Sequence, residues 1–326
     1  MDGLTNGMNT GPDLRGWLPL FINRRTAAPV VEWCRPGTRR FMEPFFEDTL
    51  KAVMREPFNL LFRHQTPLDA LLAWQRESPG LEPGGFIFHM SRCGSTLVSQ
   101  MLAALPEHIV LSEPPPLDAL LRTDRRGAAD DQRIAWLRAW MSAISQPRNG
   151  EQRLYLKLDA WHIFDLPILL RAFPGTPWIF LYRNPVEVMA SAMKVPGLHL
   201  IEGLIDTNMP AIAPPRGQRS SQVEYAAGVL ANIMRAALEH LALPGGRAFD
   251  YSRLPEAVIA DIAPHFLLDL TGPQIEAMNA RIPFNVKTPQ LYFESDTARK
   301  QQEASAEIRA LCAEHLDDLY GQLRAL

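Results

Sequence analysis

Short, mostly apolar segments alternate with helical segments along most of this chain, and this alternation limits its possible folds more than any other feature. Apolar runs of this length, bounded by turn residues, are typical of buried strands, and strands separated by helices form a parallel sheet covered on both faces. The predicted strands are Gly85–Met90, His108–Leu111, Leu154–Leu158, Trp178–Tyr182 and Arg247–Tyr251. We therefore expect an α/β fold: a three-layer sandwich with a central, mainly parallel sheet and extra helices.

Helical patterns fill the stretches between and after these strands. The predicted helices are Ser95–Leu105, Arg133–Ile144, Phe164–Phe173, Val186–Lys194, Ala226–Leu241, Glu256–His265 and Glu303–Leu326. Asn184 and Pro185 suit the N-cap and the first position of the helix that continues at Val186. Residues 195–221 and 281–300 are predicted to be loops.

Residues 1–80 differ from the rest, because polar turns interrupt their short apolar pieces and no chemical motif is visible. One helix is signalled by Thr66 as a cap and Pro67 at the first position, followed by Leu68, Leu71, Leu72 and Trp74. We expect residues 1–80 to be a helical leader that packs on the core. Residues 81–326 are expected to form the α/β domain with a C-terminal helix.

Composition narrows the class of protein. The 326 residues are 47% hydrophobic and 21% charged, which is typical of a folded globular protein and excludes disorder and coiled-coil rods. A net charge of −3 argues against a general nucleic-acid binder. Cys34, Cys93 and Cys312 show neither disulfide-framework nor metal-site spacing. Without an apolar run of about 18 residues or a signal-peptide pattern, the chain is expected to be cytoplasmic and to have no membrane span.

The segment Ser91-Arg92-Cys93-Gly94-Ser95-Thr96 lies between a predicted buried strand and the start of a helix. Free backbone N–H groups and the helix dipole favour an anion at such a place, and the segment adds hydroxyl side chains and a cation. It is not a Walker A loop, because Ser95 follows Gly94 where that motif requires Lys. The segment therefore predicts a phosphate-binding loop, with an ordinary capped turn as the alternative.

Two motifs together resemble one known family. FHMSRCGSTLVSQML is similar to the 5′-phosphosulfate loop of sulfotransferases, especially the bacterial and tyrosylprotein-type branch. FLYRNPVEVMAS resembles their 3′-phosphate motif, in which an Arg at a strand end precedes a helix with a Ser eight residues later; here these are Arg183 and Ser191. The resemblance covers about residues 84–255. It implies a P-loop-like fold and 3′-phosphoadenosine 5′-phosphosulfate (PAPS) as the donor, with 3′-phosphoadenosine 5′-phosphate (PAP) as its product.

The chain departs from the family pattern at two positions. Cys93 stands where the family usually has Ser, and Asn184 where it usually has Asp. The loss of the Ser hydroxyl removes one phosphate contact but leaves the backbone N–H groups. A second interpretation of Cys93 is a reactive thiol, since thiolates are favoured near a helix N-terminus.

Sulfuryl transfer requires a base for the acceptor hydroxyl. Glu113, after the second predicted strand, is the expected base, because the similar tyrosylprotein-type enzymes place a catalytic Glu there; the alternative is a solvated loop carboxylate. His108 is the second choice, since other sulfotransferases use a His in that region, and His89 is expected to be structural.

The reaction also requires cations for the leaving phosphate. Arg92 and Lys157 are the expected cations, and an exposed lysine is the alternative for Lys157. The resemblance places Tyr251 near the adenine, although a half-buried core tyrosine fits the sequence equally well. Lys287, Arg299 and Lys300 are candidates for closing the cofactor site, and spacing does not select one of them.

The sequence thus predicts a PAPS-dependent sulfotransferase that needs no metal and uses Glu113 as base, with Arg92 and Lys157 as cations. An ATP-dependent P-loop kinase or phosphotransferase and a non-catalytic phosphonucleotide-binding relative remain the alternatives. The acceptor hydroxyl, or amine, can belong to a small molecule, a sugar or a peptide, because the loops that select it carry no readable code. The sequence does not predict an oligomeric state.

Overall fold

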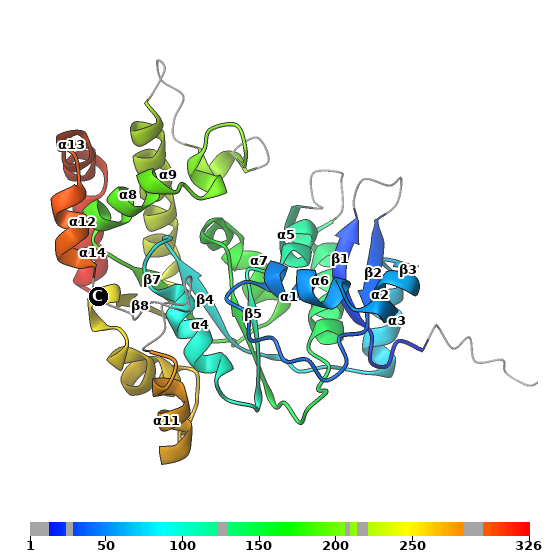
Figure 1. The fold of residues 1–326 in the computed structure, drawn as a ribbon. Helices are drawn as coiled ribbons and strands as arrows, with labels where there is room; N and C mark the ends of the chain where they lie inside the picture. The colour runs from blue at the N-terminus through cyan, green and yellow to red at the C-terminus, as the bar shows by residue number, and fades with distance from the viewer. Residues whose placement is uncertain (1–12, 24–28, 123–128, 206–208, 214–220, 283–295) are drawn as a thin grey trace, which may run out of the picture.

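Five parallel strands form the central sheet of the molecule, and their order is β5-β6-β4-β7-β8 (Figure 1). The computed structural model describes residues 13–23, 29–122, 129–205, 209–213, 221–282 and 296–326. The strands are β4 (Pro83–His89), β5 (His108–Ser112), β6 (Arg153–Lys157), β7 (Trp178–Tyr182) and β8 (Gly246–Asp250). The α/β fold with a parallel central sheet is confirmed, and each predicted strand appears within two residues of its expected ends.

Burial explains why these strands could be recognised. Every residue of β5 and β7 is buried, and β4 is buried along its last five residues. A strand covered on both faces is apolar along its whole length, since helices lie above and below it. β4 lies at the centre of the sheet between β6 and β7, so the loop that follows β4 leaves from the middle of the sheet edge.

Helices flank this sheet on both faces (Figure 1). Their bounds are α4 (Ser95–Ala103), α5 (Pro115–Leu121), α6 (Asp130–Ile144), α7 (Leu166–Ala172), α8 (Pro185–Lys194), α9 (Gln222–His240), α10 (Ala263–His265), α11 (Gly272–Asn279), α12 (Thr297–Glu303), α13 (Ala306–His315) and α14 (Asp317–Arg324). Helix α4 packs on β4, β5 and β6, while α8, α9 and α13 pack together beside β7 and β8 (Figure 1). The predicted cap of α8 is confirmed, because the side chain of Asn184 accepts a hydrogen bond from the Val186 N–H.

The leader differs from its prediction. It contains an antiparallel sheet of β1 (Leu18–Asn23), β2 (Val30–Cys34) and β3 (His64–Pro67), together with α1 (Phe46–Met54), α2 (Pro57–Leu61) and α3 (Ala70–Glu77). The predicted cap at Thr66 is wrong: Thr66 pairs with Val31 in the sheet, and its hydroxyl accepts a hydrogen bond from Trp33 Nε1 at 2.9 Å. A tertiary contact thus replaces the local capping signal.

Further helices also differ from the sequence prediction. The single C-terminal helix predicted for Glu303–Leu326 is two helices, α13 and α14, which are separated at Leu316; Ser305 caps α13 by accepting from the Ile308 N–H. Helices α5 and α11 were not predicted, although the prolines at the start of α5 are a signal for a first turn. The helix Glu256–His265, in contrast, is present over its predicted range, and its middle, Val258–Ile262, is π-helical before α10.

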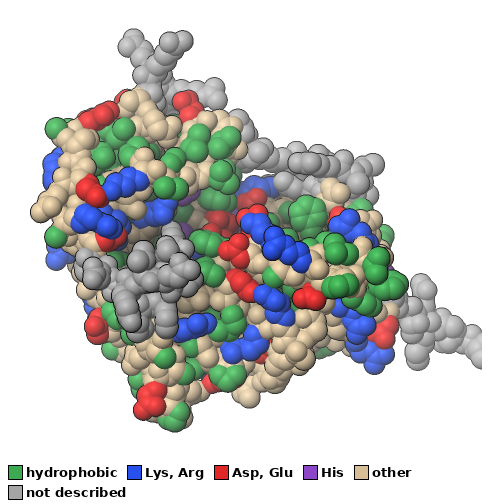
Figure 2. Space-filling model, viewed as in Figure 1, with side chains coloured by type: hydrophobic (Ala, Val, Ile, Leu, Met, Phe, Trp, Pro, Cys, Tyr) green, Lys and Arg blue, Asp and Glu red, His purple; other side chains and the backbone are tan. Residues whose placement is uncertain are grey.

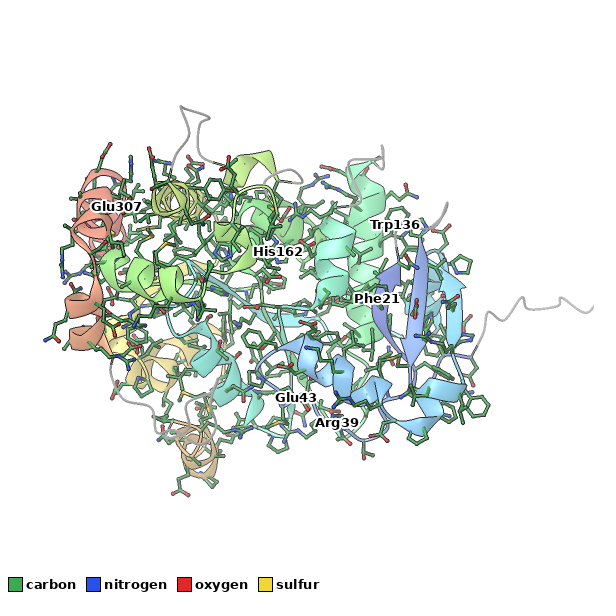
Figure 3. The ribbon with its side chains drawn as sticks, turned by 45° about the horizontal axis from the view of Figure 1, so that its top comes forward. Phe21, Arg39, Glu43, Trp136, His162 and Glu307 are labelled. Atoms are coloured by element: carbon green, nitrogen blue, oxygen red, sulfur yellow. The ribbon has the colours of Figure 1, made fainter. Side chains whose placement is uncertain are left out.

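The leader and the α/β part share one hydrophobic core, which runs from Leu14 to Leu323. Trp140 on α6 donates its indole N–H to the carbonyl of Pro19 at 3.0 Å. Figure 3 shows Trp136, also on α6, beside the strand that carries Phe21. A domain boundary at residue 80 stays a prediction.

Within the described ranges, no helix has the length and hydropathy needed to cross a bilayer.

Candidate active site

The carboxyl ends of the five parallel strands bring the predicted site residues to one edge of the sheet. β4 leads into the loop Met90–Gly94, and the next positions along this edge are Glu113 after β5, Lys157 at the end of β6 and Arg183 after β7. Tyr251 follows β8. Ligands of open α/β folds bind at this edge. On the face in Figure 2 the surface is hollowed near the middle, and histidine and acidic side chains are visible there.

The loop after β4 has the backbone of an anion-binding turn. Ser91, Arg92 and Gly94 have φ values of +79°, +53° and +83°. Consecutive left-handed and turn conformations point successive N–H groups toward one concavity. Gly94 is the N-cap of α4 and has no side chain to bond the first N–H groups of the helix, while Ser95 and Thr96 occupy its first two positions. The loop can therefore bind an anion with backbone donors and hydroxyls.

Glycine is required at position 94 for a second reason. A Cβ there would lie 2.7 Å from Leu254 Cδ1 and 3.0 Å from the ring of Tyr251. The close approach brings Tyr251 against the loop, so the fourth residue of the predicted motif is also a packing position.

Cys93 is neither a phosphate contact through its side chain nor a reactive thiol. Its side chain is fully buried, and Sγ donates to the carbonyl of Leu181 at 3.1 Å. Burial raises the pKa of the thiol to about 12. Reactive thiols are exposed and have a lowered pKa, so the second interpretation of Cys93 is wrong.

Glu113 lies in an ion pair with Lys157. Glu113 Oε1 is 2.6 Å from Lys157 Nζ and 3.4 Å from His89 Nε2. His89 Nδ1 accepts a hydrogen bond from the Ser91 N–H, so its proton is on Nε2, which faces Glu113. Burial acts to raise the pKa of Glu113, but the Lys157 charge and His89 hold it well below its ordinary value. His89, predicted to be structural, thus links the anion-binding loop to the carboxylate.

The backbone holds Glu113 in this position. Its φ of +54° is rare for a residue with a side chain. Its N–H donates to the carbonyl of Lys157 at 2.7 Å, so the ladder between β5 and β6 continues to this residue. Strained backbone conformations of this kind collect at functional sites.

The leader reaches this ion pair through Phe45, whose ring centroid is 4.8 Å from Lys157 Nζ. Figure 3 shows Arg39 and Glu43 in the leader segment that leads to Phe45. Gln100 of α4 donates to the Glu43 carbonyl at 3.2 Å and anchors this segment on α4. The leader therefore contributes one wall of the site, a role for which its sequence carries no signal.

Arg183 is almost fully buried and bonded on two sides. Its Nε donates to Glu187 at 2.6 Å, and a terminal nitrogen donates to Asp296 at 2.6 Å. Its guanidinium carbon is 3.9 Å from the centroid of the Tyr251 ring. Lys300 also contacts Asp296, at 2.7 Å. Burial acts to raise the pKa of Asp296, but bonds from Lys300 and Arg183 hold it below the ordinary value.

The structure distinguishes between Lys300 and Arg299 as candidates for closing the cofactor site, which their spacing in the sequence did not. Lys300 is buried and faces the Arg183 cluster, whereas the side chain of Arg299 is 70% exposed and 3.9 Å from Asp296. Lys287 lies outside the described residues. Ser191 lies one helical turn beyond Glu187 on α8, so it shares the helix face that contacts Arg183.

His108 lies at the opposite end of its strand from Glu113. It begins β5, its Nδ1 contacts the carbonyl of Leu102 at 2.9 Å, and its ring packs on Tyr155. Burial lowers its pKa. Four residues of extended chain, roughly 13 Å, separate it from Ser112 at the site edge. This geometry argues against His108 as the base.

A second cluster of titratable groups lies beneath the site. His162 is fully buried, and its Nε2 is 3.0 Å from Asp118 on α5. Its Nδ1 accepts from the Asp159 N–H at 3.2 Å, so the proton is on Nε2, which donates to Asp118. Burial raises the pKa of Asp159 to about 7. Figure 3 shows His162 near the middle of the molecule, where this cluster fixes the segment after Lys157.

Arg92 lies at the rim of the site and does not contact Glu113 or Lys157 directly. It is half-buried, and its guanidinium donates to the carbonyl of Val195. This bond ties the anion-binding loop to the segment after α8. In the part of the chain that the structure describes, no cluster of three or more His, Cys, Asp or Glu side chains could hold a metal ion.

Comparison with known proteins gives a consistent result. Residues 83–199 match the model of the sulfotransferase family. Sulfotransferase STF9 from Mycobacterium avium is 14% identical, with 75% of this chain and 78% of that chain covered and a TM-score of 0.48. STF1 from Mycobacterium tuberculosis is 16% identical, with 79% and 82% covered and a TM-score of 0.46.

A mouse sulfotransferase, SULT7A1, whose crystal structure is a complex with PAP, is 11% identical to this chain. The similarity covers 78% of this chain and 94% of that chain with a TM-score of 0.43. No curated protein sequence matches.

Proposed function

We propose, from the match of residues 83–199 to the sulfotransferase family model, that the protein transfers a sulfuryl group from PAPS to an acceptor hydroxyl or amine. The observation that carries the proposal is the Glu113–Lys157 ion pair, which lies at the same sheet edge as the anion-binding loop. A carboxylate beside a cation and a phosphate loop suits a transfer in which a proton leaves the acceptor and negative charge develops on a phosphate.

Two anion sites at one sheet edge support a donor with phosphates at its 5′ and 3′ positions. The 5′ end is bound by the loop Ser91–Thr96, and the 3′-phosphate by Arg183 and Ser191. The carboxylate of Asp296 already accepts hydrogen bonds from both Arg183 and Lys300. The 3′-phosphate would displace this carboxylate and accept from the same two cations. Tyr251, stacked on Arg183, offers a ring face to the adenine.

PAPS supplies an activated sulfuryl group when it is bound. Glu113 then accepts the proton of the acceptor hydroxyl at a carboxylate oxygen. In the structure its pKa is held well below the ordinary value, mainly by the charge of Lys157 against the effect of burial. When Lys157 turns its ammonium toward the leaving phosphate, Glu113 loses this stabilisation and becomes a stronger base. Through this ion pair, binding of the donor would raise the basicity of Glu113.

Charge on the leaving phosphate is stabilised by Lys157 and Arg92. Lys157 is 1% exposed, so its charge acts in a poorly solvated environment, where it is more effective than in water. Arg92 is half-buried in the loop itself. Its planar guanidinium can donate two parallel hydrogen bonds to phosphate oxygens.

Thermal unfolding with added nucleotides tests the donor. PAP is expected to raise the melting temperature of the full chain selectively, because a ligand at 100 times its Kd stabilises the native state by about 2.7 kcal/mol. AMP, ADP and ATP with Mg²⁺ are expected to give smaller shifts, since they lack the 3′-phosphate that Arg183 binds.

Arg183→Ala is expected to abolish the PAP shift. Arg299→Ala, which removes an exposed arginine 70% accessible on the same side of the molecule, is the control and is expected to retain it. A larger shift with ATP and Mg²⁺ than with PAP would contradict the proposal and indicate a phosphotransferase.

A further inference from the structure

His199 is a buried histidine that neither the sequence motifs nor the proposed transfer uses. It lies in a short 3-10 turn, Leu198–Leu200, after α8, and it is 5% exposed. Its Nε2 is fully buried and has no hydrogen-bond partner among the residues that the structure describes. A buried polar atom in a native protein ordinarily has a partner, so an unpaired one indicates a ligand or a water molecule.

His199 lies close to the segments that carry the proposed cations. Its ring lies 5.7 Å from that of Trp161, which follows Lys157 on the chain by four residues. The charges of Glu113 and Arg92 act on the His199 imidazole. The carbonyl of Val195, four residues before it, accepts the hydrogen bond from Arg92. The segment that carries His199 is therefore fastened to the anion-binding loop.

The imidazole is neutral in these surroundings. Burial lowers its pKa to about 3. A neutral imidazole has one N–H donor and one acceptor nitrogen, so it can exchange a hydrogen bond with an uncharged hydroxyl. An ionised ligand group would gain no charge attraction from it.

Apolar side chains lie in the segments near His199 and Lys157. Val195 and Leu198, in the same segment, are 65% and 60% exposed. On the other side of the site, the ring of Phe45 lies over Lys157, and the ring of Trp161 is partly exposed next to His199. A ligand that reaches Glu113 past these residues meets apolar and aromatic surface with a single unpaired nitrogen.

We propose, on the basis of the proposed function, that His199 Nε2 hydrogen-bonds the acceptor hydroxyl and orients it toward Glu113, and that this hydroxyl is carried on an apolar frame. The pairing satisfies the buried nitrogen only when an acceptor with a hydroxyl is bound. A compound of the same shape without the hydroxyl leaves Nε2 without a partner, so it is expected to bind more weakly.

Binding of 2-naphthol and of naphthalene to the PAP-loaded full chain, measured by calorimetry, tests the proposal. The two compounds share an apolar frame and differ in one hydroxyl. Wild-type protein is expected to bind 2-naphthol at least about tenfold more tightly, which corresponds to about 1.4 kcal/mol. His199→Phe keeps a ring against Trp161 but has no nitrogen, and it is expected to bind the two compounds equally.

Two further variants separate hydrogen bonding from packing. His199→Gln carries an amide at the end of its side chain and is expected to restore part of the preference for 2-naphthol. His108→Phe removes a buried imidazole at the far end of β5 and is expected to leave the preference unchanged. If His199→Phe fails to fold, His199→Leu takes its place, since Leu is smaller and still lacks a polar atom.

Equal binding of the two compounds by the wild type, or binding of neither, overturns the proposal. An unchanged preference in His199→Phe or His199→Leu also overturns it and assigns the nitrogen to a structural water. The PAP-induced rise in melting temperature is recorded for each variant. If PAP does not raise the melting temperature of the wild type, the proposed function is contradicted. If PAP raises it but the wild type does not prefer 2-naphthol to naphthalene, only the role of His199 is contradicted.

Discussion

At the scale of single residues, the Glu113–Lys157 ion pair is expected to affect both the strength of the proposed base and the free energy of unfolding. Lys157 is 1% exposed, and its charge is compensated by Glu113 at 2.6 Å. A buried ion pair adds little net stability over an apolar pair, but removal of one partner leaves an uncompensated buried charge. The site therefore depends on the two residues together.

Glu113→Gln is expected to lower the free energy of unfolding at neutral pH by about 3 kcal/mol, the lower end for a broken buried pair, because Glu113 is partly accessible. It is also expected to reduce transfer by about 10²- to 10⁴-fold, the range for loss of a general base. Denaturant unfolding and sulfate transfer from PAPS measure the two effects, and PAP binding is the control. Retained transfer would exclude Glu113 as the base.

The pH dependence of this stability has a definite sign. The pKa of Glu113 in the folded protein lies below its ordinary value of 4.5. A carboxyl with a depressed folded pKa contributes stability above its unfolded pKa and loses it as the pH falls toward the folded pKa. The stability difference between wild type and Glu113→Gln is therefore expected to be constant from pH 7 to about 5 and to shrink below about pH 4.5. A difference that grows on acidification would contradict the ion pair.

At the scale of elements, α12 contributes to the proposed second anion site with residues that lie far along the chain from Arg183. Asp296 at the N-cap and Lys300 one turn later both face Arg183. Arg299 is 3.9 Å from Asp296, but its side chain is 70% exposed, whereas that of Lys300 is 11% exposed. Residues three and four positions after Asp296 both lie near it on the helix, so burial distinguishes the two cations.

Lys300→Ala is therefore expected to weaken PAP binding by about 10- to 100-fold, the effect of losing a hydrogen bond of about 1.5–3 kcal/mol to a charged group. Arg299→Ala is the matched control, because it removes the same charge from the same helix, and its effect is expected to be less than about twofold. Calorimetric titration with PAP measures both. Equal weakening of PAP binding by the two substitutions would mean that both cations act through long-range charge attraction and not through a direct contact.

At the scale of the whole molecule, the leader and the α/β part are joined by one core. The indole of Trp140 is bonded to β1, and Phe45 of the leader lies over Lys157. Segments that share a contiguous core open together, whereas segments joined by few contacts open separately. The leader is therefore expected to belong to the cooperative unit that holds the active site.

Hydrogen exchange in increasing denaturant tests this expectation. Backbone amides of β2 in the leader and of β7 in the central sheet are expected to lose protection at the same denaturant concentration. Earlier exposure of β2 would show that residues 1–80 form a separate unit. A transition that is not two-state is common in chains of this length, so the comparison of the two strands is the decisive measurement.

The parts of the fold predicted well are those whose signals are local. β7 was predicted with its full range, and the cap at Asn184 was predicted with its residue. The antiparallel sheet of the leader was missed, in part because β2 pairs with a strand more than 30 residues away, as Val31 does with Thr66. Its residues lack the uniform apolar character of the central strands, so the local helix signal at Thr66 misled the prediction.

The sequence by itself determined the parallel sheet, the anion-binding loop and the position of Arg183, because each depends on residues adjacent in the chain. Only the tertiary structure selected Lys300 over Arg299, buried the thiol of Cys93 and brought His89 to Glu113. It alone buried the Nε2 of His199 without a hydrogen-bond partner among the described residues. The physical reason is that burial and charge pairing are set by which segments pack together, and a pattern of neighbouring residues does not record that packing.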